Sequence, residues 1–153
     1  MRVGELCKRP AVTCKAETSV LELAQLMRDR HVGDVIVVDE QEGRLTPRGI
    51  VTDRDLVVQV MAKGVNPDML RVSDIVSDRL VTVMESEGAY DAIWHMCSKG
   101  VRRLPVVDDH SRLLGVVAVD DLVQFLAEEL SALARIVPHQ IKREQAALDP
   151  GGR

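Results

Sequence analysis

Apolar and polar positions follow two alternating periods along the chain, and the same order of periods occurs twice. Short β-branched runs at 35–38 and 104–107 are typical of buried strands. Apolar residues at helical spacing predict one helix after Ser19 and another over 89–99. Ser19 and Glu22 have the spacing of a capping box, which marks the start of the first helix. Each half of the chain therefore predicts the element order β-α-β-β-α.

The two halves also align as a sequence repeat. Residues 3–40 align without a gap on 72–109, and the alignment continues after a three-residue insertion in the first copy. A second helix is predicted in each copy, at 53–63 and 120–133. A unit of about 60 residues is marginal alone, so the two units are expected to pack about a pseudo-twofold axis. This predicts an α/β (α+β) fold with a first repeat at 3–64, a linker at 65–71, a second repeat at 72–130, and a helical extension with a frayed tail at 131–153.

Two short motifs recur in both copies. The first copy has GDVIVVD at 33–39 and GIVTDRDL at 49–56, and the second has GVRRLPVVD at 100–108 and GVVAVDDL at 115–122. With this order and spacing, residues 3–130 resemble a tandem pair of CBS (cystathionine β-synthase) domains. The resemblance implies a stand-alone regulatory module with clefts for adenosine-containing ligands. It also implies a homodimer and a regulated protein that the sequence does not identify.

The family's ribose and phosphate motif places a glycine, a Ser/Thr and an Asp at fixed spacing, and Gly49, Thr52 and Asp55 match it. By this resemblance, the Asp55 carboxylate would accept hydrogen bonds from ribose hydroxyls. The Thr52 hydroxyl and the helix N-terminal amides would meet phosphate oxygens. The alternative is that Thr52 and Asp55 only cap the helix.

The second copy departs from this motif, because Ala118 stands where the family has Ser or Thr, while Asp121 is retained. We therefore expect two unequal sites, with the site at Thr52 and Asp55 dominant. Arg103 lies where the family often binds phosphate, and arginine suits bidentate phosphate contacts. The alternative for Arg103 is a solvated side chain at the start of a strand.

Three further expectations concern the ligand. Arg54 is a second, weaker candidate for phosphate. By the family resemblance, adenine would lie between Val12-Thr13 and Val35-Ile36, with the alternative that these residues are only core. AMP, ADP or ATP is the expected ligand, S-adenosylmethionine or NAD(H) is possible on the same grounds, and no cofactor is required. A competing hypothesis is a ligand-independent interaction or scaffold protein, with its C-terminal segment 130–148 as the contact.

Composition narrows the function classes. Hydrophobic residues make up 46% and charged residues 29% of the chain, and the net charge is −4. The chain has no basic run and contains one Trp, one Tyr and one Phe, so nucleic-acid binding is not expected. No apolar stretch predicts a membrane span. An odd set of three cysteines indicates a reducing cytoplasm, with Cys7 and Cys14 as core residues. Neither a metal-ligand set nor a catalytic constellation is recognisable, so we expect no enzyme.

Overall fold

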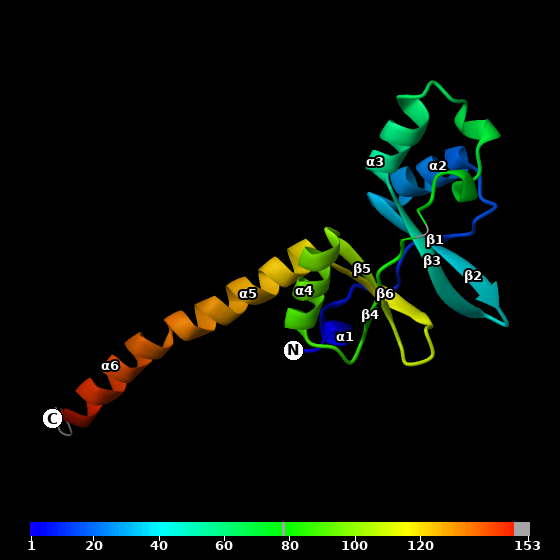
Figure 1. Ribbon diagram of the computed structural model, residues 1–153. Coiled ribbons are helices and arrows are strands. Elements are labelled where there is room, and N and C mark those ends of the chain that lie inside the picture. The colour runs from blue at the N-terminus through cyan, green and yellow to red at the C-terminus, as the bar shows by residue number, and fades with distance from the viewer. Residues whose placement is uncertain (78, 149–153) are drawn as a thin grey trace.

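Residues 1–77 and 79–148 are described by the computed structural model of the protein. Figure 1 shows two α/β units with a long helical arm projecting from one of them. Each unit has a three-stranded sheet in which the first strand is parallel to the second and the second is antiparallel to the third. This confirms the expected α+β class. The strands of the first sheet are β1 (Thr13–Cys14), β2 (Asp34–Gln41) and β3 (Arg44–Thr52), and those of the second are β4 (Val83–Met84), β5 (Arg103–Val107) and β6 (Leu113–Ala118).

The first helix of each repeat forms where the apolar spacing predicts it. These helices are α2 (Val20–Arg30) and α4 (Ala89–Lys99). The capping box predicted for α2 is present, because the Glu22 amide donates to Ser19 Oγ at 3.1 Å and the Ser19 amide donates to Glu22 Oε2 at 3.0 Å. The positions of α2 and α4 could therefore be predicted from the sequence.

The second helix of the first repeat differs from the prediction. Instead of one helix over 53–63, α3 (Asp53–Leu56) is followed by a π-helical turn η1 (Val57–Met61), closed by a hydrogen bond from the Ala62 amide to the Val57 carbonyl at 2.8 Å. β-branched residues lose rotamer freedom in an α-helix, and three of the five residues in η1 are valines. Short 3-10 turns follow, η2 (Pro67–Met69) in the linker and η3 (Val72–Asp74) at the start of the second repeat.

The C-terminal extension is helical, as expected. Helix α5 (Val119–Ala134) is joined through Arg135 to α6 (Ile136–Leu148), and the two project together away from the body (Figure 1). Pro138 lies in the first turn of α6, where its missing N–H removes no hydrogen bond within α6. The frayed tail predicted for 149–153 lies outside the described residues.

Each hydrophobic core contains a segment from the start of the other repeat. Val3, in the short helix α1 (Val3–Leu6), is fully buried in the core that also holds Leu104 and Leu122. Val72 is fully buried in the core of the first repeat. The contacts are reciprocal, because the Val3 amide donates to the Glu87 carbonyl and the Val72 amide donates to the Thr18 carbonyl, both at 2.9 Å. Each core is therefore built from one sequence repeat and the first segment of the other repeat.

The cysteines occupy environments close to those expected. Cys14 is 8% exposed in the first core, and burial raises the pKa of its thiol to about 11. Cys7 is half-buried and packs against the second core, while Cys97 is exposed. Cys14 therefore behaves as a small apolar core residue.

Candidate functional site

Thr52 and Asp55 lie at the junction of β3 and α3, where a strand delivers its last residue to a helix start. The Thr52 amide donates to Asp55 Oδ2 at 2.8 Å, and the Asp55 amide donates to Thr52 Oγ1 at 3.3 Å. The Thr52 hydroxyl also donates to Asp55 Oδ2, at 3.1 Å. The capping role considered for these residues is therefore present. The cap hydrogen bonds to the carboxylate all use Oδ2.

The same two side chains also line a cleft of about 940 Å³, which is in the size range of small-molecule sites. Its walls come from both repeats. Ile50, Thr52 and Asp55 belong to the first repeat, and 80–82 to the extended segment before β4. The remaining lining residues, from this segment and the end of α4, are Ser77, Arg79, His95, Ser98, Lys99 and Val101.

A second hollow of about 410 Å³ shares Ile50, Thr52 and Val101 with this cleft and is rich in arginine. Arg54, Arg102 and Arg103 all line it. The structure thus brings both predicted phosphate-binding arginines, Arg54 and Arg103, next to Thr52. The combined region joins a cleft of mixed polar and apolar lining to a hollow lined by three arginines and one acidic residue, Asp53.

Arg103 is already engaged in an ion pair across the two repeats. Its Nε lies 2.7 Å from Oδ1 of Asp34, the residue at the start of β2. Asp34 is the register partner of Thr52 in the sheet, so this carboxylate lies beside the predicted site. Burial raises the pKa of Asp34, and the nearby Arg103 charge opposes that shift. An anionic ligand reaching Arg103 would compete with Asp34.

In the second repeat, Lys8 lies beside Asp121, the counterpart of Asp55. Lys8 Nζ lies 2.8 Å from Asp121 Oδ1, while Asp121 Oδ2 accepts a hydrogen bond from the Ala118 amide at 2.8 Å. The Asp121 carboxylate raises the pKa of Lys8 through this hydrogen bond. The backbone of Lys8 exchanges two hydrogen bonds with Val116 of β6, at 2.9 and 3.1 Å, which fixes the segment here. The two repeats thus differ in more than the Ala118 replacement.

The residues predicted to hold adenine lie within the first sheet. Val35 and Ile36 are fully buried, and the Ile36 amide donates to the Val12 carbonyl at 2.9 Å. Thr13 is the register partner of Ile36. The core role considered for Val35 and Ile36 is therefore present, and none of the four residues lines the cleft at Thr52 and Asp55. Their contact with a ligand remains a prediction.

Gly49 has a packing role. A Cβ built at this position would lie 2.3 Å from Val76 Cγ2, so the glycine allows the segment after η3 to lie on β3. This close approach accounts for the glycine without a ligand. It also places the covering segment directly beside the cleft.

Sequence reasoning did not assign the wall formed by residues 80–82. The repeat alignment contained the signal, since 80–82 are the equivalents of 11–13, which include the predicted adenine segment of the first copy. The residues predicted for the dominant site all came from the first copy, apart from the phosphate candidate Arg103. The structure places Thr52 and Asp55 opposite the segment of the other copy, because the two repeats pack reciprocally.

Metal-ligand clusters and membrane-spanning helices are two further features that bear on function. Within 1–77 and 79–148, no three His, Cys, Asp or Glu side chains gather as metal ligands. Across the same residues, no helix has both the length and the apolar character that crossing a bilayer requires.

Comparison with known proteins identifies the family. The CBS domain family matches residues 3–62 and 72–128, and the chain belongs to it. Among curated relatives, the uncharacterized protein MK0525 of Methanopyrus kandleri is 39% identical over 122 residues, covering 80% of this chain and 61% of its own length.

Solved structures share the fold. The CBS domain pair of protein MJ0100, in complex with 5′-methylthioadenosine and S-adenosyl-L-methionine, matches with a TM-score of 0.73 and 22% identity, over 84% of this chain and 98% of its own. The CBS domain protein PAE2072 from Pyrobaculum aerophilum, complexed with AMP, matches with a TM-score of 0.73 and 23% identity, over 84% and 99%. A hexameric CBS-CP12 protein from bloom-forming cyanobacteria matches with a TM-score of 0.73 and 24% identity, over 99% and 90%.

Proposed function

We propose that the protein is a non-catalytic regulatory module that binds an adenosine-containing ligand in the cleft between its repeats. The observation that carries this proposal is the cleft formed by Thr52 and Asp55 of the first repeat and residues 80–82 of the second. A ligand that contacts both repeats binds some arrangements of the two repeats more tightly than others. Its binding therefore favours one arrangement over another. A partner protein would read that change.

The basic hollow favours a ligand that carries phosphate. Arg54, Arg102 and Arg103 line it, and Arg79 and Lys99 line the neighbouring cleft. Arginine binds phosphate through paired hydrogen bonds as well as charge. AMP, ADP or ATP therefore fits this region better than an uncharged nucleoside. Complexes of family members with AMP and with S-adenosyl-L-methionine support the adenosine class.

A scaffold protein that keeps the fold without a ligand is the second candidate. It is favoured by the internal ion pairs, because Asp34 pairs with Arg103 and Lys8 pairs with Asp121, so these charged groups already have partners within the chain. In that case the relevant surface would be the exposed C-terminal extension. The two candidates differ in whether ligand-free protein binds an adenosine compound at all.

Calorimetric titration of AMP, ADP, ATP, S-adenosylmethionine and NADH into the full chain tests the proposal. Asp55→Ala should weaken the bound ligand roughly 10- to 150-fold, because a charge-assisted hydrogen bond contributes about 1.5–3 kcal/mol. Asp55→Asn keeps an oxygen for the Thr52 amide, so it separates loss of the charge from loss of the cap. Thermal unfolding of both variants reports whether the helix start is preserved.

Asp121→Asn is the matched control, since it makes the same change at the counterpart of Asp55 in the second repeat, where Lys8 already pairs with the carboxylate. It should change affinity less than about threefold, well below the loss of a charge-assisted hydrogen bond. An Asp121 variant that weakens binding more than the Asp55 variants would place the site in the other repeat. Absence of binding to wild-type protein freed of ligand would reject the sensor in favour of the scaffold.

A further inference from the structure

The helical extension carries an apolar stripe that the chain itself leaves uncovered. All residues from 127 to 148, which we call the arm, are exposed. The stripe runs from α5 into the arm at alternating spacings of three and four residues. Such spacing places side chains on one face of a helix and is the heptad pattern of paired helices. The stripe consists of Val123, Leu126, Leu130, Leu133 and Val137. Leu126 is half-buried against the second core, and the other four are exposed.

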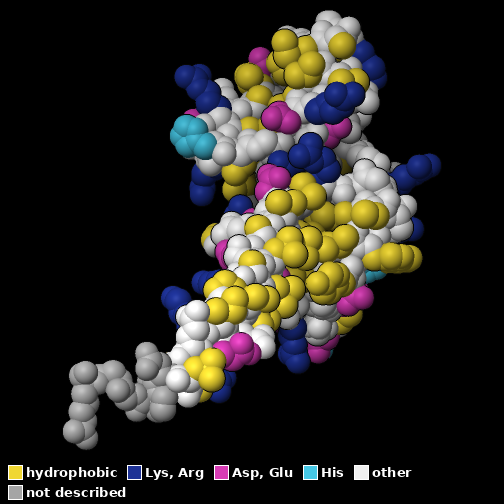
Figure 2. All heavy atoms as spheres, turned by 90° about the vertical axis from the view of Figure 1, so that its left-hand side faces the viewer, with side chains coloured by type: hydrophobic (Ala, Val, Ile, Leu, Met, Phe, Trp, Pro, Cys, Tyr) yellow, Lys and Arg dark blue, Asp and Glu magenta, His cyan; other side chains and the backbone are white. Residues whose placement is uncertain are grey.

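The stripe continues onto the body of the second repeat. On α4, which packs beside α5, Tyr90 is 70% exposed and Trp94 is 64% exposed. Figure 2 shows apolar side chains gathered over this part of the body and along the beginning of the arm. A continuous apolar surface of this kind marks a contact with another molecule. Most helical stability in proteins comes from packing of an apolar face, so a partner on this surface would also stabilise the projecting arm.

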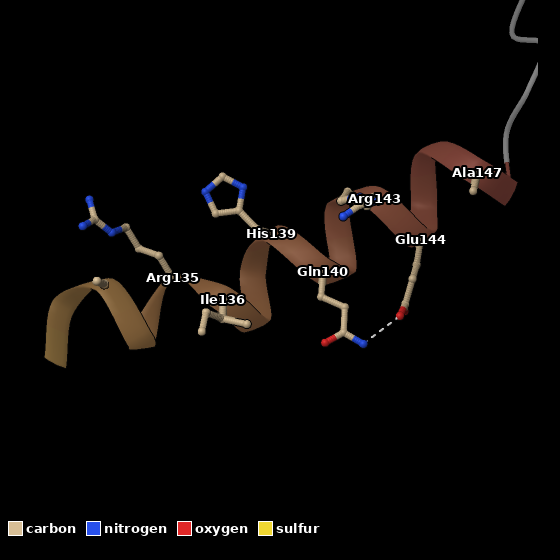
Figure 3. A pocket seen from close by; sticks show the side chains of 8 residues that line it. Arg135, Ile136, His139, Gln140, Arg143, Glu144 and Ala147 are labelled. Carbon is tan, nitrogen blue, oxygen red and sulfur yellow. Dashed lines mark hydrogen bonds between the residues drawn. The ribbon is translucent and has the colours of Figure 1, made fainter. Parts of the chain in front are cut away.

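The close view of α6 shows its side chains in two rows. Ile136, Gln140 and Glu144 point to one side of the helix, and the Gln140 amide donates to Glu144 at 3.0 Å (Figure 3). Arg135 and His139 point to the other side. The concave strip between these rows is lined by α5 and α6 alone. This strip faces roughly 100° around the helix from the apolar stripe, so the contact face is the stripe and not this strip.

The distribution of charge identifies which helix fits. Helix α5 carries four acidic residues and no basic residue, whereas 135–148 carries three basic residues and one acidic residue. Two antiparallel copies place the acidic half of each beside the basic half of the other. Two parallel copies place like charges together. The helix dipole alone does not explain this pattern, because its effect fades beyond the terminal turns and Glu129 lies well inside the joined helix.

We propose that the arm pairs antiparallel with the arm of a second copy of this chain, about a twofold axis near Arg135. Leu133 then faces Val137 of the second copy, and Glu129 lies beside Arg143 of the second copy. Both charged residues flank the apolar stripe at equivalent heptad positions, where charge pairs set the orientation of helix pairs. The end of each arm reaches the apolar surface at Tyr90 and Trp94 of the other copy.

Sedimentation velocity of the full chain over a concentration series tests this arrangement. Wild type should dimerise, and Glu129→Lys or Arg143→Glu should each weaken the dimer roughly tenfold, because two pairs per dimer become repulsive. The double variant Glu129→Lys/Arg143→Glu restores opposite charges in an antiparallel pair and should dimerise like wild type. Glu128→Lys is the matched control, since it makes the same charge change about 100° further around the helix, away from the stripe.

Three results would overturn the proposal. One is a monomeric wild-type chain at every concentration. Another is an equal effect of Glu128→Lys and Glu129→Lys. The third is a double variant weaker than either single variant, which contradicts antiparallel pairing. Leu133→Glu adds an independent measurement: the side chain is 61% exposed, so the variant should fold normally yet lose the dimer. A Leu133→Glu dimer as strong as wild type would show that the body, and not the arm, forms the contact.

Discussion

At the scale of single residues, the ion pair between Asp34 and Arg103 decides how the basic hollow meets an anion. The sequence places an acid near a predicted phosphate site, and the structure shows this acid within 2.7 Å of the arginine that was expected to bind phosphate. A ligand phosphate must therefore displace Asp34 or share Arg103 with it. The cost of this competition depends on the charge of Asp34.

Asp34→Asn should raise the affinity for ATP roughly threefold to tenfold, because it removes a like charge and frees Arg103. Adenosine, which has no phosphate, should bind both proteins equally, and parallel titrations with the two ligands measure this difference. Equal gains for both ligands would mean that Asp34 acts on the shape of the cleft and not through charge.

The pKa of Asp34 gives the sign of the pH effect. Burial raises this pKa in the folded protein, so folding favours the protonated form. The stability contributed by Asp34 is therefore fully present below the pKa of the unfolded chain and is lost as the pH rises through the raised pKa of the folded protein. Protonation of Asp34 also frees Arg103, so lowering the pH and the Asp34→Asn change act on the hollow in the same direction.

At the scale of elements, two equivalent glycines allow a covering segment to pack closely on the third strand of each sheet. A Cβ at Gly49 would meet the Val76 side chain at 2.3 Å, and a Cβ at Gly115 would meet the Lys8 carbonyl at 2.4 Å. A side chain can rotate away, whereas the Lys8 carbonyl is fixed by its hydrogen bond from the Val116 amide at 3.1 Å. The two positions are therefore alike in sequence and different in tolerance.

Gly115→Ala should destabilise the protein by about 2–3 kcal/mol, and Gly49→Ala by about 1 kcal/mol, because overpacking costs most where the neighbour cannot move. Urea denaturation of both variants measures the difference. Val76→Ala combined with Gly49→Ala should recover part of the loss, since it removes the methyl group in contact. An equal loss at both positions would mean that Val76 is as rigid as the Lys8 backbone.

The elements themselves could largely be predicted from the sequence. Helix α4 and the capped helix α2 follow local signals, namely apolar spacing and the Ser19–Glu22 pair. The π-helical turn at 57–61 could not be predicted, because helical spacing does not distinguish a wide turn from an α-helical one. Among the site residues, Thr52 and Asp55 lie together as their motif requires. The wall at 80–82 depends on how two repeats pack, and local patterns carry no information about that.

At the scale of the whole molecule, the exchange of first segments joins the two cores. Val3 and Val72 are both fully buried, each in the core of the repeat to which it does not belong in sequence. Loosening either segment therefore exposes the other repeat. We expect the body to unfold as one cooperative unit despite having two separate cores.

Val3→Ala and Val72→Ala should each destabilise the protein by about 2–3 kcal/mol, as expected for shortening a fully buried valine. Differential scanning calorimetry should show one transition for wild type and for both variants, shifted to lower temperature. Two resolved transitions, of which Val3→Ala moves only one, would mean that the repeats unfold independently.

The reciprocal first segments also bear on how such a chain can arise. A single repeat made alone would lack the segment that completes its core and would hold a free segment that fits the same place in another molecule. Two such molecules would complete each other by trading their leading segments. The present chain has the packing of such a pair, with both molecules joined in one polypeptide. The two halves differ at equivalent positions, since Thr52 in one half corresponds to Ala118 in the other.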